Sequence, residues 1–147
     1  MANRKPHILF LCTGNSCRSQ MAEGFANFLG SECLEAHSAG LEAHGKNPNA
    51  VAIMREAGVD ISGQESKLVT PELVNWADMV VTVCGHADEH CPVLPATVPK
   101  QHWPIPDPAK ARGTADEIEA TFRAARDDIQ NRVRQLIATL TRDRTES

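Results

Sequence analysis

The stretch from residue 7 to residue 30 constrains the fold more than any other part of the chain. His7–Leu11 is a short apolar run typical of a buried strand, and small, turn-forming residues follow it. From about Arg18 apolar residues recur at helical spacing, and Gly30 stands where a residue in the left-handed conformation would end a helix. A buried strand joined by a tight loop to a helix is the repeating unit of parallel α/β sheets.

Strands and helices continue to alternate after this unit. Glu35–Ala39 and Met79–Val83 are predicted strands, and the second is apolar throughout, as a strand covered on both faces should be. Asn47-Pro48 and Thr70-Pro71 each place a capping residue before a proline, which predicts the start of a helix. Gly58 is predicted to end the first of these two helices.

The last third of the chain predicts an irregular connection and then a long helix. The segment from Cys91 through Pro108 contains six prolines, so only a brief strand near His102-Trp103 is expected there. Thr114 and Glu117 form a capping-box pattern that opens a long amphipathic helix. The alternation as a whole predicts an α/β fold, a three-layer sandwich with a parallel sheet between layers of helices.

Length and composition predict one soluble domain over residues 1–147, with flexible ends at about 1–6 and 142–147. No apolar run approaches the roughly 18 residues that a membrane span needs, and the N-terminus lacks the pattern of a signal peptide. A cytoplasmic location is therefore expected. The net charge is −4 with both signs mixed along the chain, which predicts no nucleic-acid or membrane partner and, with the acidic composition, a monomer.

The loop after the first strand carries the pattern of an anion site. Cys12 ends the strand, and five residues separate it from Arg18 at the start of the helix. Such a loop can turn its backbone N–H groups inward around an oxyanion, which the planar guanidinium of Arg18 would also bind, and this positive environment favours the thiolate form of Cys12. Gly14 and Asn15 tolerate left-handed backbone, and the Ser19 hydroxyl could hydrogen-bond the Cys12 sulfur. The spacing alone also fits a buried cysteine and a solvated arginine.

A wider set of residues points to a known family. Residues 12–24 resemble the signature loop of low-molecular-weight protein tyrosine phosphatases and, in detail, of their thioredoxin-coupled arsenate reductase relatives, whose pattern His37–Gly40 and Asp60–Ser62 also match. The resemblance covers nearly the whole chain and implies a four-stranded parallel sheet with helices on both faces and Cys12 as nucleophile. Cys17 has no role that the sequence argues, and its side chain is expected to point away from the anion. The implied oxyanion-binding loop consists of Thr13, Gly14, Asn15, Ser16, Cys17, Arg18 and Ser19.

Asp107 is the predicted general acid. Attack on a tetrahedral oxyanion requires a proton for the departing oxygen, which a carboxylic acid near the site usually supplies. Asp107 lies in a proline-rich segment, and Pro108 after it favours extended backbone at the aspartate. An Asp-Pro pair in isolation is more often a plain turn. The resembled family has its catalytic acid at this Asp-Pro position, which favours the catalytic role.

Two further cysteines suggest a thiol relay. Once Cys12 carries arsenic, Cys84 at the end of its predicted strand could attack the Cys12 sulfur and expel arsenite, and Cys91 could then attack Cys84. A helix over this stretch would hold the two relay cysteines roughly 10 Å apart, too far for a disulfide, so the segment would have to unwind. The alternatives are two buried thiols, or a metal site completed by His86 or His90, although the spacing is unlike that of zinc sites.

A potassium site known in some relatives is altered in this chain. Asn15, Glu23 and Ser38 match three of its ligands, while Lys67 aligns with the later acidic ligand. A lysine ammonium could take the place of the cation. No metal and no other cofactor is therefore predicted.

The predicted function is the reduction of arsenate to arsenite in arsenic detoxification, with arsenate as substrate and, by resemblance, thioredoxin as reductant. The main alternative is a low-molecular-weight tyrosine phosphatase, in which Cys12, Arg18 and Asp107 hydrolyse a phosphoester. Such enzymes typically carry aromatic residues around the pocket, whereas this chain has no tyrosine, and only a weak phosphatase side activity is expected. A non-enzymatic thiol clamp for arsenite would need Cys84 and Cys91 but neither Arg18 nor Asp107.

Overall fold

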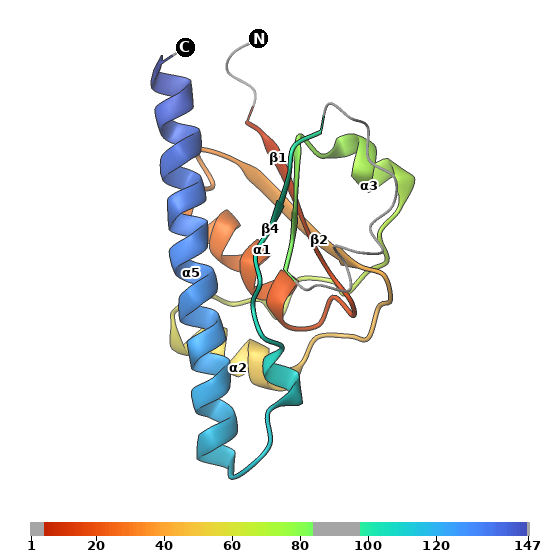
Figure 1. The fold of residues 1–147 in the computed structure, drawn as a ribbon, viewed down its shortest axis with the longest axis vertical. Helices are drawn as coiled ribbons and strands as arrows, with labels where there is room; N and C mark the ends of the chain where they lie inside the picture. The colour runs from red at the N-terminus through yellow and green to blue at the C-terminus, as the bar shows by residue number, and fades with distance from the viewer. Residues whose placement is uncertain (1–4, 84–97, 147) are drawn as a thin grey trace.

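A computed structural model of the chain describes residues 5–83 and 98–146, with side chains up to residue 141. Its centre is one sheet of four parallel strands in the order β2-β1-β3-β4, drawn in Figure 1. The predicted four-stranded parallel sheet is thus confirmed, and the brief strand expected near residue 102 is its last strand. The strands are β1 (His7–Cys12), β2 (Glu35–Gly40), β3 (Met79–Thr82) and β4 (Lys100–His102).

Helices cover both faces of the sheet, as predicted. In Figure 1, α1 and α5 lie on one side of the strands and α3 lies on the other, while α2 packs against α5. A 3-10 turn, η1 (Pro108–Lys110), precedes the last helix. The helices are α1 (Arg18–Leu29), α2 (Pro48–Glu56), α3 (Pro71–Trp76) and α5 (Ala115–Glu146).

The apolar run of β1 explains its central place. β1 pairs with β2 on one side and with β3 on the other, and residues 8–11 are fully buried. A strand with neighbours on both edges and helices over both faces has no side that contacts water, so every position favours an apolar residue. The carboxyl end of this buried strand is the point at which the chain turns into the loop of Cys12.

Local signals placed the helix starts correctly. The Asn47 side chain accepts a hydrogen bond from the Asn49 amide at 2.8 Å, and the Thr70 hydroxyl accepts one from the Leu73 amide at 3.2 Å. The Thr114 hydroxyl does the same for the Glu117 amide at 3.2 Å. Each side chain satisfies a backbone donor that has no partner within its helix. The inner face of α5 is buried at Phe122, Ile129, Val133 and Leu136, as its periodicity predicts.

Gly30 ends α1 for a reason other than the one predicted. Its φ is −124°, so the left-handed stop expected there is wrong. A Cβ atom added at this position would lie 2.8 Å from Cδ1 and 2.9 Å from Cγ1 of Ile137 on α5. The glycine is required because the end of α1 and the last helix pack too closely for a larger residue.

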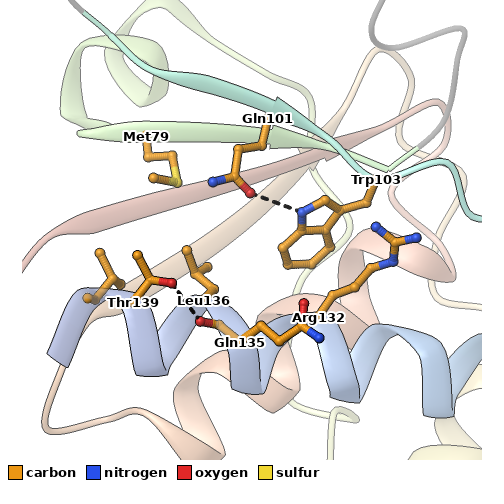
Figure 2. Close-up of a pocket in the computed structure, with 8 residues that line it drawn as sticks. Met79, Gln101, Trp103, Arg132, Gln135, Leu136 and Thr139 are labelled. Atoms are coloured by element: carbon orange, nitrogen blue, oxygen red, sulfur yellow. Dashed lines mark hydrogen bonds between the residues drawn. The ribbon is translucent and has the colours of Figure 1, made fainter. Parts of the chain in front are cut away.

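A hollow of about 230 Å³ lies between α5 and the edge of the sheet at β4 (Figure 2). Met79, Leu136 and Leu140 supply apolar surface, and the Trp103 indole donates a hydrogen bond to the Gln101 side chain at 3.1 Å. No cysteine or carboxylate lines this hollow, so it holds neither a nucleophile nor an acid. None of the helices in the described part of the chain has the length and apolar character that crossing a bilayer requires.

The contact between Gly30 and Ile137 yields a test of the packing. Gly30→Ala should lower the free energy of unfolding by about 1–3 kcal/mol, because the new methyl group forces the Ile137 side chain to shift in a packed interface. Urea denaturation measures this change, and adding Ile137→Val, which removes the nearest atom, should recover part of the loss. Gly63→Ala is the matched control, since nothing lies within 4 Å of a Cβ at that position. Equal effects of the two alanine substitutions would contradict the packing argument.

Candidate active site

The backbone of the loop after β1 is oriented by the segment that follows β2. Because a trans peptide points its C=O and the next N–H in opposite directions, carbonyls directed at residues 41–47 turn the following N–H groups of the loop the other way. Those N–H groups therefore point away from residues 41–47. The bonds are Leu41 N to Cys12 O at 3.2 Å, Glu42 N to Thr13 O at 2.8 Å, His44 N to Gly14 O at 2.9 Å and Asn47 N to Ser16 O at 3.0 Å.

Asn15 holds the middle of the loop. Its φ is +50°, the left-handed conformation predicted for it, and its side chain is fully buried. Its amide group donates to Ser19 Oγ at 2.8 Å and to Ser38 Oγ at 3.0 Å, while its carbonyl oxygen accepts from the Lys67 backbone amide at 2.8 Å. One side chain thus ties the loop to α1, to β2 and to the segment before α3. Gly14, by contrast, is not in the left-handed region.

The Cys12 sulfur lies at the foot of a hydrogen-bonded chain. Its Sγ is 2.8 Å from Ser19 Oγ, the contact that the sequence predicted, and the Cys12 residue is 3% exposed. Ser19 Oγ already accepts from the Asn15 amide, so its own hydrogen is free to be donated to the sulfur. The Ser19 side chain therefore holds the Cys12 sulfur in contact with the hydrogen-bond network of Asn15.

Arg18 connects the loop to the proline-rich segment after β4. Its Nη1 donates to the carbonyl oxygen of Ile105 at 2.9 Å and to that of Val83 at 3.3 Å, and its Nη2 lies 3.6 Å from Asp107 Oδ2. Asp107 has the extended backbone expected before Pro108 (φ −75°, ψ 110°). The guanidinium therefore places a carboxyl group beside the thiol although the two residues are far apart in sequence.

The thiol, the guanidinium and the carboxyl group share one pocket of about 170 Å³. It is smaller than the hollow at α5, yet it is the one that holds reactive groups. His44 also lines the pocket, although it was not predicted from the sequence. A glutamate and a histidine two residues apart in a loop are not a specific motif. The pocket is lined by Cys12, Thr13, Gly14, Ser16, Cys17, Arg18, His44, Asp107 and Ala109.

Cys17 lies against this pocket, so the expectation that its side chain points away is wrong. Burial raises the pKa of the Cys17 thiol from 9.0 to about 11, and the nearby charges of Asp107 and Cys12 act in the same direction, against the hydrogen bond from Ser16. A thiol with this pKa stays protonated near neutral pH. Two cysteines therefore share the pocket, and Cys17 does not compete with Cys12 as a thiolate nucleophile.

The side chains of Asn15, Ser38 and Glu23, which match three potassium ligands of some relatives, are hydrogen-bonded to one another. Ser38 donates to Glu23 Oε1 at 2.6 Å, and the Lys67 ammonium lies 3.4 Å from Nδ1 of His37. No ion pair joins Lys67 to Glu23 among the side chains that the structure describes, which gives no support to the idea that the ammonium replaces the cation. In the same part of the chain no group of three histidine, cysteine or acidic side chains is arranged to hold a metal ion.

Cys84 and Cys91 lie outside the described residues, as do His86 and His90. The relay and the unwinding of its segment therefore stay predictions. The residues that the structure brings together are Cys12, Arg18, Ser19 and Asp107.

The sequence model of low molecular weight phosphotyrosine protein phosphatases matches residues 7–146. The chain belongs to this family. An arsenate reductase of Shouchella clausii is 53% identical over 135 residues, which are 92% of this chain and 97% of the relative. A solved arsenate reductase in a phosphate-binding state is 35% identical with a TM-score of 0.76, covering 92% of this chain and 98% of that one. A thioredoxin-dependent arsenate reductase of Corynebacterium glutamicum is 26% identical with a TM-score of 0.76, over 97% of this chain and 65% of that chain.

Because the Cys17 thiol is buried, the free energy of unfolding of this family member should fall at alkaline pH. The pKa of the Cys17 thiol is 9.0 in the unfolded chain and about 11 in the folded chain. The stabilisation that the protonated thiol gives the folded chain is therefore fully present below pH 9.0 and is lost as the pH rises to about 11. The loss should be about 2–3 kcal/mol. Urea denaturation at both ends of this range, with a reductant present, should show a smaller loss for Cys17→Ala than for wild type. Cys33→Ala, at a half-exposed site, should behave like wild type, and identical losses in all three proteins would refute the assignment.

Proposed function

We propose that this phosphatase-family chain reduces arsenate to arsenite for arsenic detoxification and is recharged by thioredoxin. The observation that carries the proposal is the single pocket in which Cys12, Arg18 and Asp107 meet. The arsenate reductases to which the chain is similar cover nearly its full length, and one solved relative is described as thioredoxin-dependent.

The first step attaches arsenic to Cys12. The thiolate, assisted by the Ser19 hydroxyl at 2.8 Å, attacks the arsenic atom, and Asp107 protonates the departing oxygen, which leaves as water. Arg18 and the N–H groups of the loop bind the remaining oxygens and stabilise their negative charge. The arsenic is still pentavalent at this stage, because one oxygen ligand has been exchanged for sulfur.

The second step moves the electrons. The Cys84 thiolate attacks the Cys12 sulfur, the sulfur–arsenic bond breaks with its electron pair going to arsenic, and trivalent arsenite leaves a Cys12–Cys84 disulfide. Cys91 then attacks Cys84, which releases the Cys12 thiolate and forms a Cys84–Cys91 disulfide. The dithiol of thioredoxin reduces this last disulfide, so two electrons pass from thioredoxin to each arsenate.

A tyrosine phosphatase would use the same three groups without the relay. Cys12 would be phosphorylated, and Asp107 would protonate the leaving alcohol. The shared anion site supports a weak activity of this kind. The thiol-clamp alternative does not account for the contact between Arg18 and Asp107 at 3.6 Å, because binding of neutral arsenite needs neither residue.

The relay is tested by arsenate-dependent NADPH oxidation in the presence of thioredoxin and thioredoxin reductase. Wild type should oxidise NADPH with multiple turnovers. Cys12→Ser, Cys84→Ser and Cys91→Ser should each abolish turnover, because each variant lacks one thiol of the relay. Mass spectrometry after a single turnover should find the Cys12–Cys84 disulfide in the Cys91→Ser variant. Cys33→Ser should turn over like wild type, since Cys33 contacts Thr141 away from the pocket. A wild type that hydrolyses an aryl phosphate but is inert toward arsenate would be a phosphatase.

The role of Asp107 has its own test. Asp107→Asn keeps the size of the side chain but removes the proton donor, so kcat/KM for arsenate should fall by about 10²–10⁴-fold. Thioredoxin should still reduce the oxidised variant at the wild-type rate, because that step does not use the acid. Asp60→Asn, at an exposed carboxylate bonded to Ser62, serves as the control. A similar kcat/KM for Asp107→Asn and wild type would remove Asp107 from the mechanism.

A further inference from the structure

His44 occupies one side of the mouth of the active-site pocket. Six of the nine residues that line the pocket belong to the loop of residues 12–18, and His44 is one of the three that come from elsewhere. Its side chain is 55% exposed and also lines the cavity, so the imidazole stands where the pocket opens to solvent. Its backbone N–H donates to the carbonyl oxygen of Gly14 at 2.9 Å, which fixes the position of the residue against the loop.

The imidazole ring is held from two sides. Its Nε2 lies 2.5 Å from Oε2 of Glu42, a short hydrogen bond to a carboxylate. Its Nδ1 atom lies against the loop, because a Cβ atom added at Gly14 would lie 2.4 Å from Nδ1. A ring bonded at one nitrogen and packed at the other has little freedom to swing away from the mouth.

The size of the pocket makes this placement important. A volume of about 170 Å³ is well below the roughly 300–1,000 Å³ of sites that enclose drug-sized organic ligands. A free tetrahedral oxyanion fits within the loop, whereas the organic group of an ester has to project through the mouth. Such a group has to pass the exposed imidazole of His44, which lines the pocket.

We propose that His44, held in place by Glu42, determines specificity by narrowing the mouth, so that the pocket accepts free tetrahedral oxyanions and disfavours aryl esters. The inference deepens the proposed arsenate reduction and rests on it for the identity of the natural oxyanion. It predicts that this chain of the phosphatase family discriminates against the aryl phosphates that the same catalytic groups could hydrolyse.

Ligand binding tests the proposal without any turnover. The reduced protein is alkylated with iodoacetamide, and the modification of Cys12 is followed by peptide mass spectrometry while inorganic phosphate or phenylphosphonate protects the thiol. The ratio of the two dissociation constants reports selectivity. Wild type should favour phosphate, and His44→Ala should shift the ratio toward phenylphosphonate by roughly tenfold, the size of effect typical of steric discrimination in a pocket. An unchanged ratio, or a wild type that binds both ligands equally, would overturn the proposal.

Two further variants separate the mouth from other effects. Glu42→Ala keeps the imidazole but removes the bond that holds it, and should shift the ratio in the same direction by a smaller factor. His102→Ala, at an exposed histidine on β4 that does not line the pocket, should leave the ratio as in wild type. A shift in His102→Ala as large as in His44→Ala would also refute the assignment.

The outcome is independent of the proposed function. If the ratio shifts as expected but wild type shows no arsenate-dependent NADPH oxidation, the specificity role of His44 holds and arsenate reduction fails. If wild type reduces arsenate but the ratio of the two dissociation constants is unchanged in His44→Ala, arsenate reduction holds and the specificity role of His44 fails.

Discussion

The site depends on the hydrogen bonds that turn the carbonyl oxygens of residues 12–16 toward the segment after β2. Four carbonyls accept from residues 41–47, and each such bond turns the next N–H of the loop away from that segment. Asn15 completes the arrangement in left-handed backbone with a fully buried side chain. These bonds fix the loop backbone within the folded chain itself. Under the proposed function, backbone dipoles that are already oriented would stabilise the charge of the transition state without reorganisation.

The two cysteine side chains at the pocket, Cys12 and Cys17, have different environments. The Cys12 sulfur is hydrogen-bonded with Ser19 Oγ at 2.8 Å, whereas Cys17 is kept protonated because burial raises its pKa to about 11. Arg18 contributes at two levels: it presents a positive charge to the site, and it bonds the carbonyl oxygen of Ile105, which brings the segment of Asp107 to the thiol. The acid is thus positioned through a long-range contact of the guanidinium. Removing Arg18 should therefore release the segment of Asp107 and, under the proposed mechanism, weaken anion binding as well.

Local patterns predicted most of the fold because their physical causes are local. The apolar run of residues 7–11, the capping residues Asn47 and Thr70, and the periodicity of the last helix each act within a few residues, and all were confirmed. Gly30 shows the limit of this reasoning. Its position at the end of α1 was predictable, but its conformation was not. The glycine is required because it packs against Ile137, more than a hundred residues later in the chain.

The sequence alone determined the alternation of strands and helices, the loop between Cys12 and Arg18, and the candidate acid at Asp107, because spacing, capping and proline chemistry act along the chain. Only the tertiary structure decided that Cys17 faces the pocket, that His44 stands at its mouth and that Lys67 contacts His37. These facts depend on how separate segments meet in space. Side-chain direction and burial at such meetings are set by partners that no local pattern contains.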